Sequence, residues 1–80
     1  MPLEPLIIEW LDRGVLSLRG PLTMETQSSF QNAIRREDAP TMILDLTGVP
    51  YIDSSGLGSL VSAHVSCEKS GRRIVLSGPS

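Results

Sequence analysis

The spacing of hydrophobic positions changes several times along this chain, and each change marks a new element. Residues 5–11 are mostly apolar and residues 15–19 alternate between apolar and polar, which predicts two strands. The intervening residues 12–14 (Asp-Arg-Gly) favour a tight turn, since aspartate and glycine tolerate the backbone angles of a reversal. We therefore expect an antiparallel hairpin. The Gly-Pro pair at 20–21 should end it, because proline has no amide hydrogen for a strand ladder.

The spacing becomes helical after residue 23. Phe30 and the apolar pair at 33–34 lie three and four positions apart among polar residues, which predicts an amphipathic helix. Thr23 is the expected N-cap, and Glu25 is expected in the first turn, where its charge suits the helix dipole. The helix should close at residues 37–40 (Glu-Asp-Ala-Pro), because helical geometry is disfavoured directly before a proline.

The second half of the chain returns to a strand, a helix and a strand. Residues 41–46 form a nearly continuous apolar run, which predicts a central strand covered on both faces. Gly71 is expected to end a second helix, and residues 74–76 to form a further strand. Apolar spacing predicts the buried stripe of that helix to be Leu57, Leu60, Val61, His64 and Val65.

The predicted order is strand, strand, helix, strand, helix, strand. Strands separated by helices pair in parallel through right-handed crossovers. The fold class is therefore α/β, with a mixed sheet in which an antiparallel N-terminal hairpin precedes a parallel β-α-β-α-β arrangement. The 80 residues are 40% hydrophobic, enough for one small core, so residues 1–80 are expected to form a single domain.

Composition and charge argue against several functions. A formal net charge of −2 gives no basic footprint for nucleic acid, and one residue each of Trp, Tyr and Phe provide no base-stacking platform. One cysteine (Cys67) and one histidine (His64) make neither a disulfide nor a Cys/His zinc site, so we expect no metal and no cofactor. The sequence shows no apolar run of membrane-spanning length and no signal-peptide pattern, and its single cysteine favours the cytoplasm.

An enzyme is not expected. The surroundings of Ser54 are similar to the nucleophile elbow of hydrolases, but the glycine that should precede the serine is absent. A catalytic triad would need His64, which falls on the predicted apolar stripe. Residues 56–58 (Gly-Leu-Gly) lack the spacing and the lysine of a phosphate-binding loop.

The most informative segment is residues 53–57, between an apolar strand and an amphipathic helix. It can be interpreted in two ways. In the first, Ser54 or Ser55 caps the helix and contributes about 1 kcal/mol, Asp53 is a cap or turn former, and Gly56 allows close approach of helix and sheet. In the second, an exposed serine accepts a phosphate, which adds about −1.5 to −2 charges and is stabilised by the helix N-terminus.

Three stretches of the chain resemble the STAS family, in particular bacterial anti-sigma factor antagonists. They are residues 43–46 (Ile-Leu-Asp-Leu), 52–58 (Ile-Asp-Ser-Ser-Gly-Leu-Gly) and 71–76 (Gly-Arg-Arg-Ile-Val-Leu). The resemblance implies a protein that binds an anti-sigma factor which is also a GHKL-type serine kinase. The unphosphorylated antagonist sequesters that kinase and frees the sigma factor, so that sigma-factor-dependent transcription is regulated.

The resemblance also assigns roles to individual residues. It implies that Ser54 is the phosphoacceptor, that its phosphorylation switches the antagonist off, and that a PP2C-type phosphatase restores it. The implied partner-binding residues around it are Asp53, Ser55, Gly56, Leu57 and Thr23.

The sequence departs from the family in two places. The family often has Gly-x-Leu-Asp after the second strand, whereas residues 20–23 are Gly-Pro-Leu-Thr, so Thr23 replaces an acid near the partner surface. Family domains also continue beyond residues 74–76 with a helix, a strand and a helix. We therefore expect either a longer natural chain or a homodimer that covers the exposed sheet edge.

A second interpretation uses the same fold differently. STAS domains also serve as non-phosphorylated scaffold or regulatory subunits, for example with lipid ABC transporters or in stress-signalling complexes. Ser54 alone does not distinguish this role from the phosphorylation switch. A neighbouring gene for a GHKL-type kinase would favour the switch, and neighbouring transporter subunits would favour the scaffold.

Overall fold

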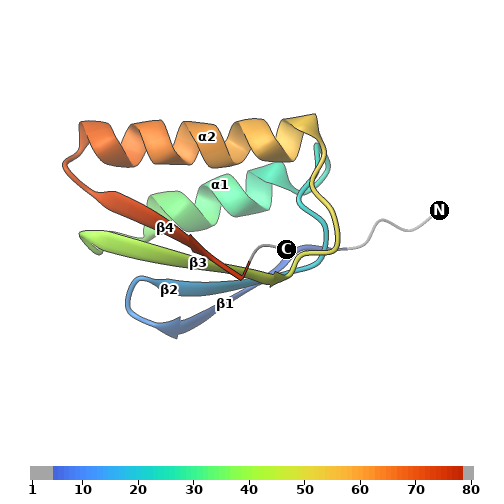
Figure 1. The fold of residues 1–80 in the computed structure, drawn as a ribbon, viewed down its shortest axis with the longest axis horizontal. Coiled ribbons are helices and arrows are strands. Elements are labelled where there is room, and N and C mark those ends of the chain that lie inside the picture. Colours follow the sequence, from blue (N-terminus) through green and yellow to red (C-terminus); the bar gives the residue numbers. More distant parts are fainter. Residues whose placement is uncertain (1–4, 79–80) are drawn as a thin grey trace.

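The computed structural model describes residues 5–78 and contains the six expected elements in the expected order (Figure 1). The strands and helices are β1 (Ile7–Asp12), β2 (Val15–Arg19), α1 (Gln27–Arg36), β3 (Thr41–Gly48), α2 (Ser54–Lys69) and β4 (Arg73–Ser77).

The four strands form one sheet in the order β1-β2-β3-β4. Strand β1 pairs with β2 in antiparallel orientation, whereas β2 with β3 and β3 with β4 are parallel. The predicted mixed α/β sheet is therefore confirmed. Both helices lie on the same face of this sheet, and β1 and β4 are its two edges among the described residues (Figure 1).

Strand β3 is central but is covered on one face only. Met42, Leu44 and Leu46 are buried, whereas Ile43 and Asp45 between them are only half-buried. The expectation of cover on both faces was wrong, because α1 and α2 pack on the same side and leave the other side open. The apolar Ile43 within this run hid the alternation that a one-sided strand normally displays.

The core lies between the helices and the sheet. Its strand contributions are alternate residues of β2 and β3, which point to the same face because the side-chain period of a strand is two. Phe30, Ala33 and Ile34 of α1 are buried, as predicted. The core cluster is Leu16, Leu18, Leu22, Phe30, Ala33, Ile34, Met42, Leu44, Leu46, Leu60, Ala63 and Cys67.

Helix α1 begins later than its sequence predicts. Its N-cap position is Thr26, whose side chain makes no capping bond, so the prediction of Thr23 as N-cap was wrong. The Thr23 carbonyl instead accepts N–H bonds from Thr26 (3.1 Å) and Gln27 (2.9 Å), which folds residues 23–26 into a turn. Glu25 consequently precedes the helix and accepts a bond from the Thr23 hydroxyl at 2.9 Å.

Helix α2 presents a different face to the core from the one predicted. Its buried residues are Gly56, Ser59, Leu60, Ala63 and Cys67. Of the predicted buried stripe only Leu60 is buried. The prediction was wrong for Leu57, Val61, His64 and Val65, which are exposed. Most of the buried residues of α2 are small, whereas its two valines are exposed. Gly71 follows the helix with φ +73°, as expected for a C-terminal glycine.

Glu37, directly after α1, joins three parts of the fold through its carboxylate. One oxygen accepts bonds from Trp10 Nε1 and Gly14 N, both at 3.0 Å. The other accepts from the N–H groups of Asp38 and Ala39, also at 3.0 Å. The side chain is buried, and these bonds, that from Ala39 foremost, hold the pKa of Glu37 below its ordinary value against the opposing effect of desolvation.

Arg72, directly before β4, bonds to the α1–β3 connection that contains Glu37. Its Nε donates to the Ala39 carbonyl at 3.0 Å, and a terminal nitrogen donates to the Glu37 carbonyl at 2.8 Å. The α1–β3 and α2–β4 connections are thereby held together at one end of the sheet.

Replacing Glu37 with glutamine should destabilise the protein. The amide keeps one acceptor oxygen but turns a donor toward N–H groups, so we expect a loss of about 1–3 kcal/mol in the free energy of unfolding at pH 7. Urea denaturation measures the loss. Glu9→Gln, a change at an exposed position of β1, is the matched control.

The same carboxylate predicts an acid sensitivity. A group whose pKa is lowered by folding stabilises the protein above its unfolded-state pKa, here near 4.5, and that contribution is lost as pH falls through the folded-state pKa. The stability of the native chain should therefore fall more steeply below this pH than that of Glu37→Gln. Parallel profiles for the two proteins would contradict the assignment.

Candidate partner-binding site at the start of helix α2

Asp53 starts helix α2. It has extended backbone geometry, and its Oδ1 accepts a bond from Gly56 N at 2.8 Å. The expectation that the hydroxyl of Ser54 or Ser55 caps the helix was therefore wrong, and the alternative role for Asp53 as cap is the one observed. A carboxylate here satisfies one of the unpaired N–H groups of the first turn and complements the positive end of the helix dipole.

The second oxygen of Asp53 reaches the loop after β2. Oδ2 accepts from Met24 N at 3.2 Å, and the Asp53 N–H donates to the Leu22 carbonyl at 3.2 Å. Leu22 in turn donates to the Tyr51 carbonyl at 3.2 Å and forms an isolated parallel bridge with Ile52. One side chain thus fixes the β2–α1 loop against the β3–α2 loop.

Gly56 lies against the same loop. A Cβ at this position would collide with the carbonyl of Leu22, so the backbone of α2 can approach only because the side chain is absent. The predicted close approach is confirmed, but Gly56 meets the β2–α1 loop rather than a strand.

Ser54 is the first residue of α2 and is exposed, whereas Ser55 is half-buried. The first intrahelical bond runs from Leu57 N to the Asp53 carbonyl at 2.9 Å, and Asp53 Oδ1 takes the Gly56 N–H. Within residues 5–78 no hydrogen bond uses the hydroxyl of Ser54. The N–H groups of Ser54 and Ser55 remain at a helix end that favours negative charge.

Exposed apolar side chains lie on α2 and on the two loops that meet at its start. Leu57, predicted as a partner contact, is 58% exposed one turn further along the helix. The other exposed apolar residues of this region were not predicted from the sequence. Met24, Tyr51 and Ile52 lie in loops and have no periodic spacing, and the helical spacing of Val61 placed it on the predicted buried stripe. We call this set, together with Leu57, the apolar ring: Met24, Tyr51, Ile52, Leu57 and Val61.

Thr23 contributes less surface than its neighbours. Its side chain is 7% exposed and bonded to Glu25, whereas Met24 beside it is 62% exposed. Gly56 is likewise buried. The predicted partner-binding residues thus divide into the exposed Asp53 and Leu57, the half-buried Ser55, and the buried Thr23 and Gly56; the predicted phosphoacceptor Ser54 is exposed.

The described part of the chain contains no group of three or more His, Cys, Asp or Glu residues arranged to hold a metal ion. Neither of its helices is long and apolar enough to cross a membrane.

The structure defines the class as an α/β domain with a mixed four-stranded sheet and both helices on one face. An exposed serine directly follows the N-cap of the second helix. The chain belongs to the STAS family: the family model of the STAS domain matches residues 7–80.

Solved structures place this fold in several settings. The anti-sigma factor antagonist SpoIIAA in its unphosphorylated form is 23% identical with a TM-score of 0.68, and the match covers 94% of this chain and 74% of SpoIIAA. SpoIIAA of Bacillus in its phosphorylated form, also 23% identical, has a TM-score of 0.70, with 94% and 73% covered. A sulfate transporter family protein from Wolinella succinogenes is 29% identical with a TM-score of 0.72.

The relatives differ greatly in length. The match to the Wolinella protein covers 90% of this chain and 62% of that one. The structure called Mglu, 19% identical with a TM-score of 0.78, is covered over only 19% of its length, against 92% of this chain. The same fold thus occurs within longer chains.

The two glycines of α2 provide a matched test of the close contact between Gly56 and the β2–α1 loop. Gly56→Ala should cost about 1–3 kcal/mol, because the new methyl group must displace the Leu22 carbonyl. Gly58→Ala has open space around it and should stabilise the helix by up to about 1 kcal/mol. Thermal or urea unfolding of both variants measures the difference. Equal effects at the two positions would contradict a close contact at Gly56.

Proposed function

We propose that this STAS domain is an anti-sigma factor antagonist that binds an anti-sigma factor with serine kinase activity and is switched off by phosphorylation of Ser54. The observation that carries the proposal is the exposed Ser54 at the start of α2, next to a cap supplied by Asp53 and on the same helix as the exposed Leu57. The fold likeness to SpoIIAA, which has been solved in unphosphorylated and phosphorylated forms, supports it.

The chemistry of the switch follows from charge. A phosphate on Ser54 would change the formal net charge from −2 to about −4, and would place that charge on the same helix as the exposed Leu57. A partner that buries Leu57 and Met24 would then have to desolvate a dianion, which is costly without a matching cation. The fold itself need not change.

The remaining parts of this proposal are its partners and location. A GHKL-type kinase phosphorylates Ser54, a PP2C-type phosphatase reverses the modification, and the exchange takes place in the cytoplasm. The protein has no catalytic role of its own in this scheme.

Incubation with the cognate kinase and ATP, followed by mass spectrometry, tests the switch. We expect one phosphate on Ser54, and loss of kinase binding in Ser54→Asp measured by calorimetry. Ser54→Ala should keep binding and escape inactivation, and Ser55→Ala should still be phosphorylated. Unmodified Ser54, or undiminished binding by Ser54→Asp, would overturn the proposal.

A scaffold or regulatory subunit, in a lipid ABC transporter or a stress-signalling complex, is the second candidate. It is supported by the 29% identity with a sulfate transporter family protein. In this role the apolar ring would bind its partner constitutively. Partner binding that depends on Leu57 but is insensitive to Ser54→Asp would favour the scaffold over the switch.

We also propose that the protein forms a homodimer through β4. This strand is at a sheet edge of the described chain, with Val75 40% and Leu76 47% exposed, and an unpaired edge is a template for another strand. Sedimentation velocity should show a dimer that Val75→Lys disrupts. Ile7→Lys, on the opposite edge strand β1, should leave it intact. A protein that is monomeric at all concentrations would contradict this.

A further inference from the structure

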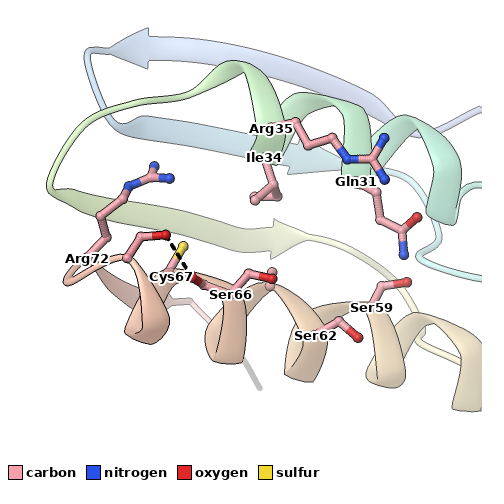
Figure 2. Close-up of a pocket in the computed structure, with 10 residues that line it drawn as sticks. Gln31, Ile34, Arg35, Ser59, Ser62, Ser66, Cys67 and Arg72 are labelled. Carbon is pink, nitrogen blue, oxygen red and sulfur yellow. Dashed lines mark hydrogen bonds between the residues drawn. The ribbon is translucent and has the colours of Figure 1, made fainter.

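A groove runs between α1 and α2, away from Ser54. It holds about 270 Å³ and exists because α2 presents small residues where it faces α1. Ser59, Ala63 and Ser66 succeed one another along this side, so the two helices leave space that larger side chains would fill (Figure 2). Near the start of α2, Ser59 Oγ lies 3.2 Å from Gln27 Oε1.

The lining of the groove has an apolar part and a polar part. Ile34, Ala63 and Cys67 are each at most 8% exposed and supply apolar surface. Gln31 from α1 and the Ser62 hydroxyl from α2 are polar lining groups on opposite sides (Figure 2). An apolar surface with a few polar groups is the usual composition of a small-molecule site.

The charge of the groove has one sign. Arg35 and Arg72 line it with their guanidinium groups apart from one another, and no carboxylate of the described residues lines it (Figure 2). Arg72 is fixed in place by its bonds to the carbonyls of Glu37 and Ala39, which occupy part of its fork of five donors. Arg35 makes no ion pair among residues 5–78, where Asp38 pairs with Arg13. In a chain of net charge −2, the groove thus carries two positive charges and no negative charge from its lining residues.

From these observations we propose that the α1–α2 groove binds a small organic anion, with its carboxylate or phosphate group at the guanidinium of Arg35 and a short apolar body against Ile34, Ala63 and Cys67. The volume of about 270 Å³ lies near the lower end of ligand pockets and limits the body to a short chain or a single ring. Guanidinium groups bind both kinds of oxyanion through paired N–H bonds. This site lies along the middle of α2 and does not depend on the function proposed for Ser54.

Titration of the full ¹⁵N-labelled protein with hexanoate, hexyl phosphate and hexanol tests the proposal by NMR. We expect saturable shifts at the amides of Ala63, Ser66 and Cys67 with at least one of the two anions, and binding at least tenfold weaker for hexanol. The anion that binds more tightly identifies carboxylate or phosphate as the preferred group.

Three variants locate the site. Arg35→Gln should weaken anion binding about tenfold, since a charge-assisted bond is lost. Ser62→Leu, at an exposed position, should fill the groove and abolish binding without unfolding the protein. Arg13→Gln removes the same charge from an exposed site outside the groove and should change nothing. Absence of saturable binding, equal binding of hexanol, or unchanged affinity in Arg35→Gln would overturn the proposal.

Discussion

The structure around the candidate site depends on the carboxylate of Asp53. One oxygen caps α2 at Gly56 N (2.8 Å) and the other holds Met24 N (3.2 Å), so the helix start and the β2–α1 loop are fixed by a single side chain. The missing side chain of Gly56 lets the two segments approach this closely. Loops normally move more than the elements they connect, but these two are tied to the end of a 16-residue helix. Ser54 is therefore presented from a rigid base.

Helix α2 shows how residue size decides which face is buried. Hydrophobicity alone favours Leu57, Val61 and Val65 for the core, yet these are 58%, 55% and 41% exposed. The inward face consists mainly of glycine, serine and alanine. Close contact with the β2–α1 loop excludes a side chain at Gly56, whereas the small residues that face α1 leave space beside it. Two surfaces result from this choice: the apolar side chains turned outward near Ser54, and the groove that the small residues leave beside α1.

The sequence predicts the element order and the sheet, because strand alternation and helical spacing report which residues meet the core. The burial of Phe30 and Ile34 follows directly from this spacing. Failures occurred where contacts that hydrophobic spacing and capping preference do not reveal decide the local structure. Thr23 has the composition of an N-cap, but the bond from the Thr26 hydroxyl to the Pro21 carbonyl folds this segment into a turn before the helix starts. The packing of α2 depends on the carbonyl of Leu22, 34 residues earlier in the chain, which no local pattern reveals.

The cap and the proposed phosphate do not compete for the same groups. Asp53 takes the N–H of Gly56, whereas the N–H groups of Ser54 and Ser55 precede it at the helix end. A phosphate on Ser54 could accept bonds from these groups and leave the cap in place, although its charge would repel the Asp53 carboxylate. Exposure to water screens this repulsion. The bonds that Asp53 accepts from Gly56 N and Met24 N use different N–H groups from those available to the phosphate. Modification of Ser54 would therefore act on a partner's surface rather than on the fold, as a switch in a small, marginally stable domain requires.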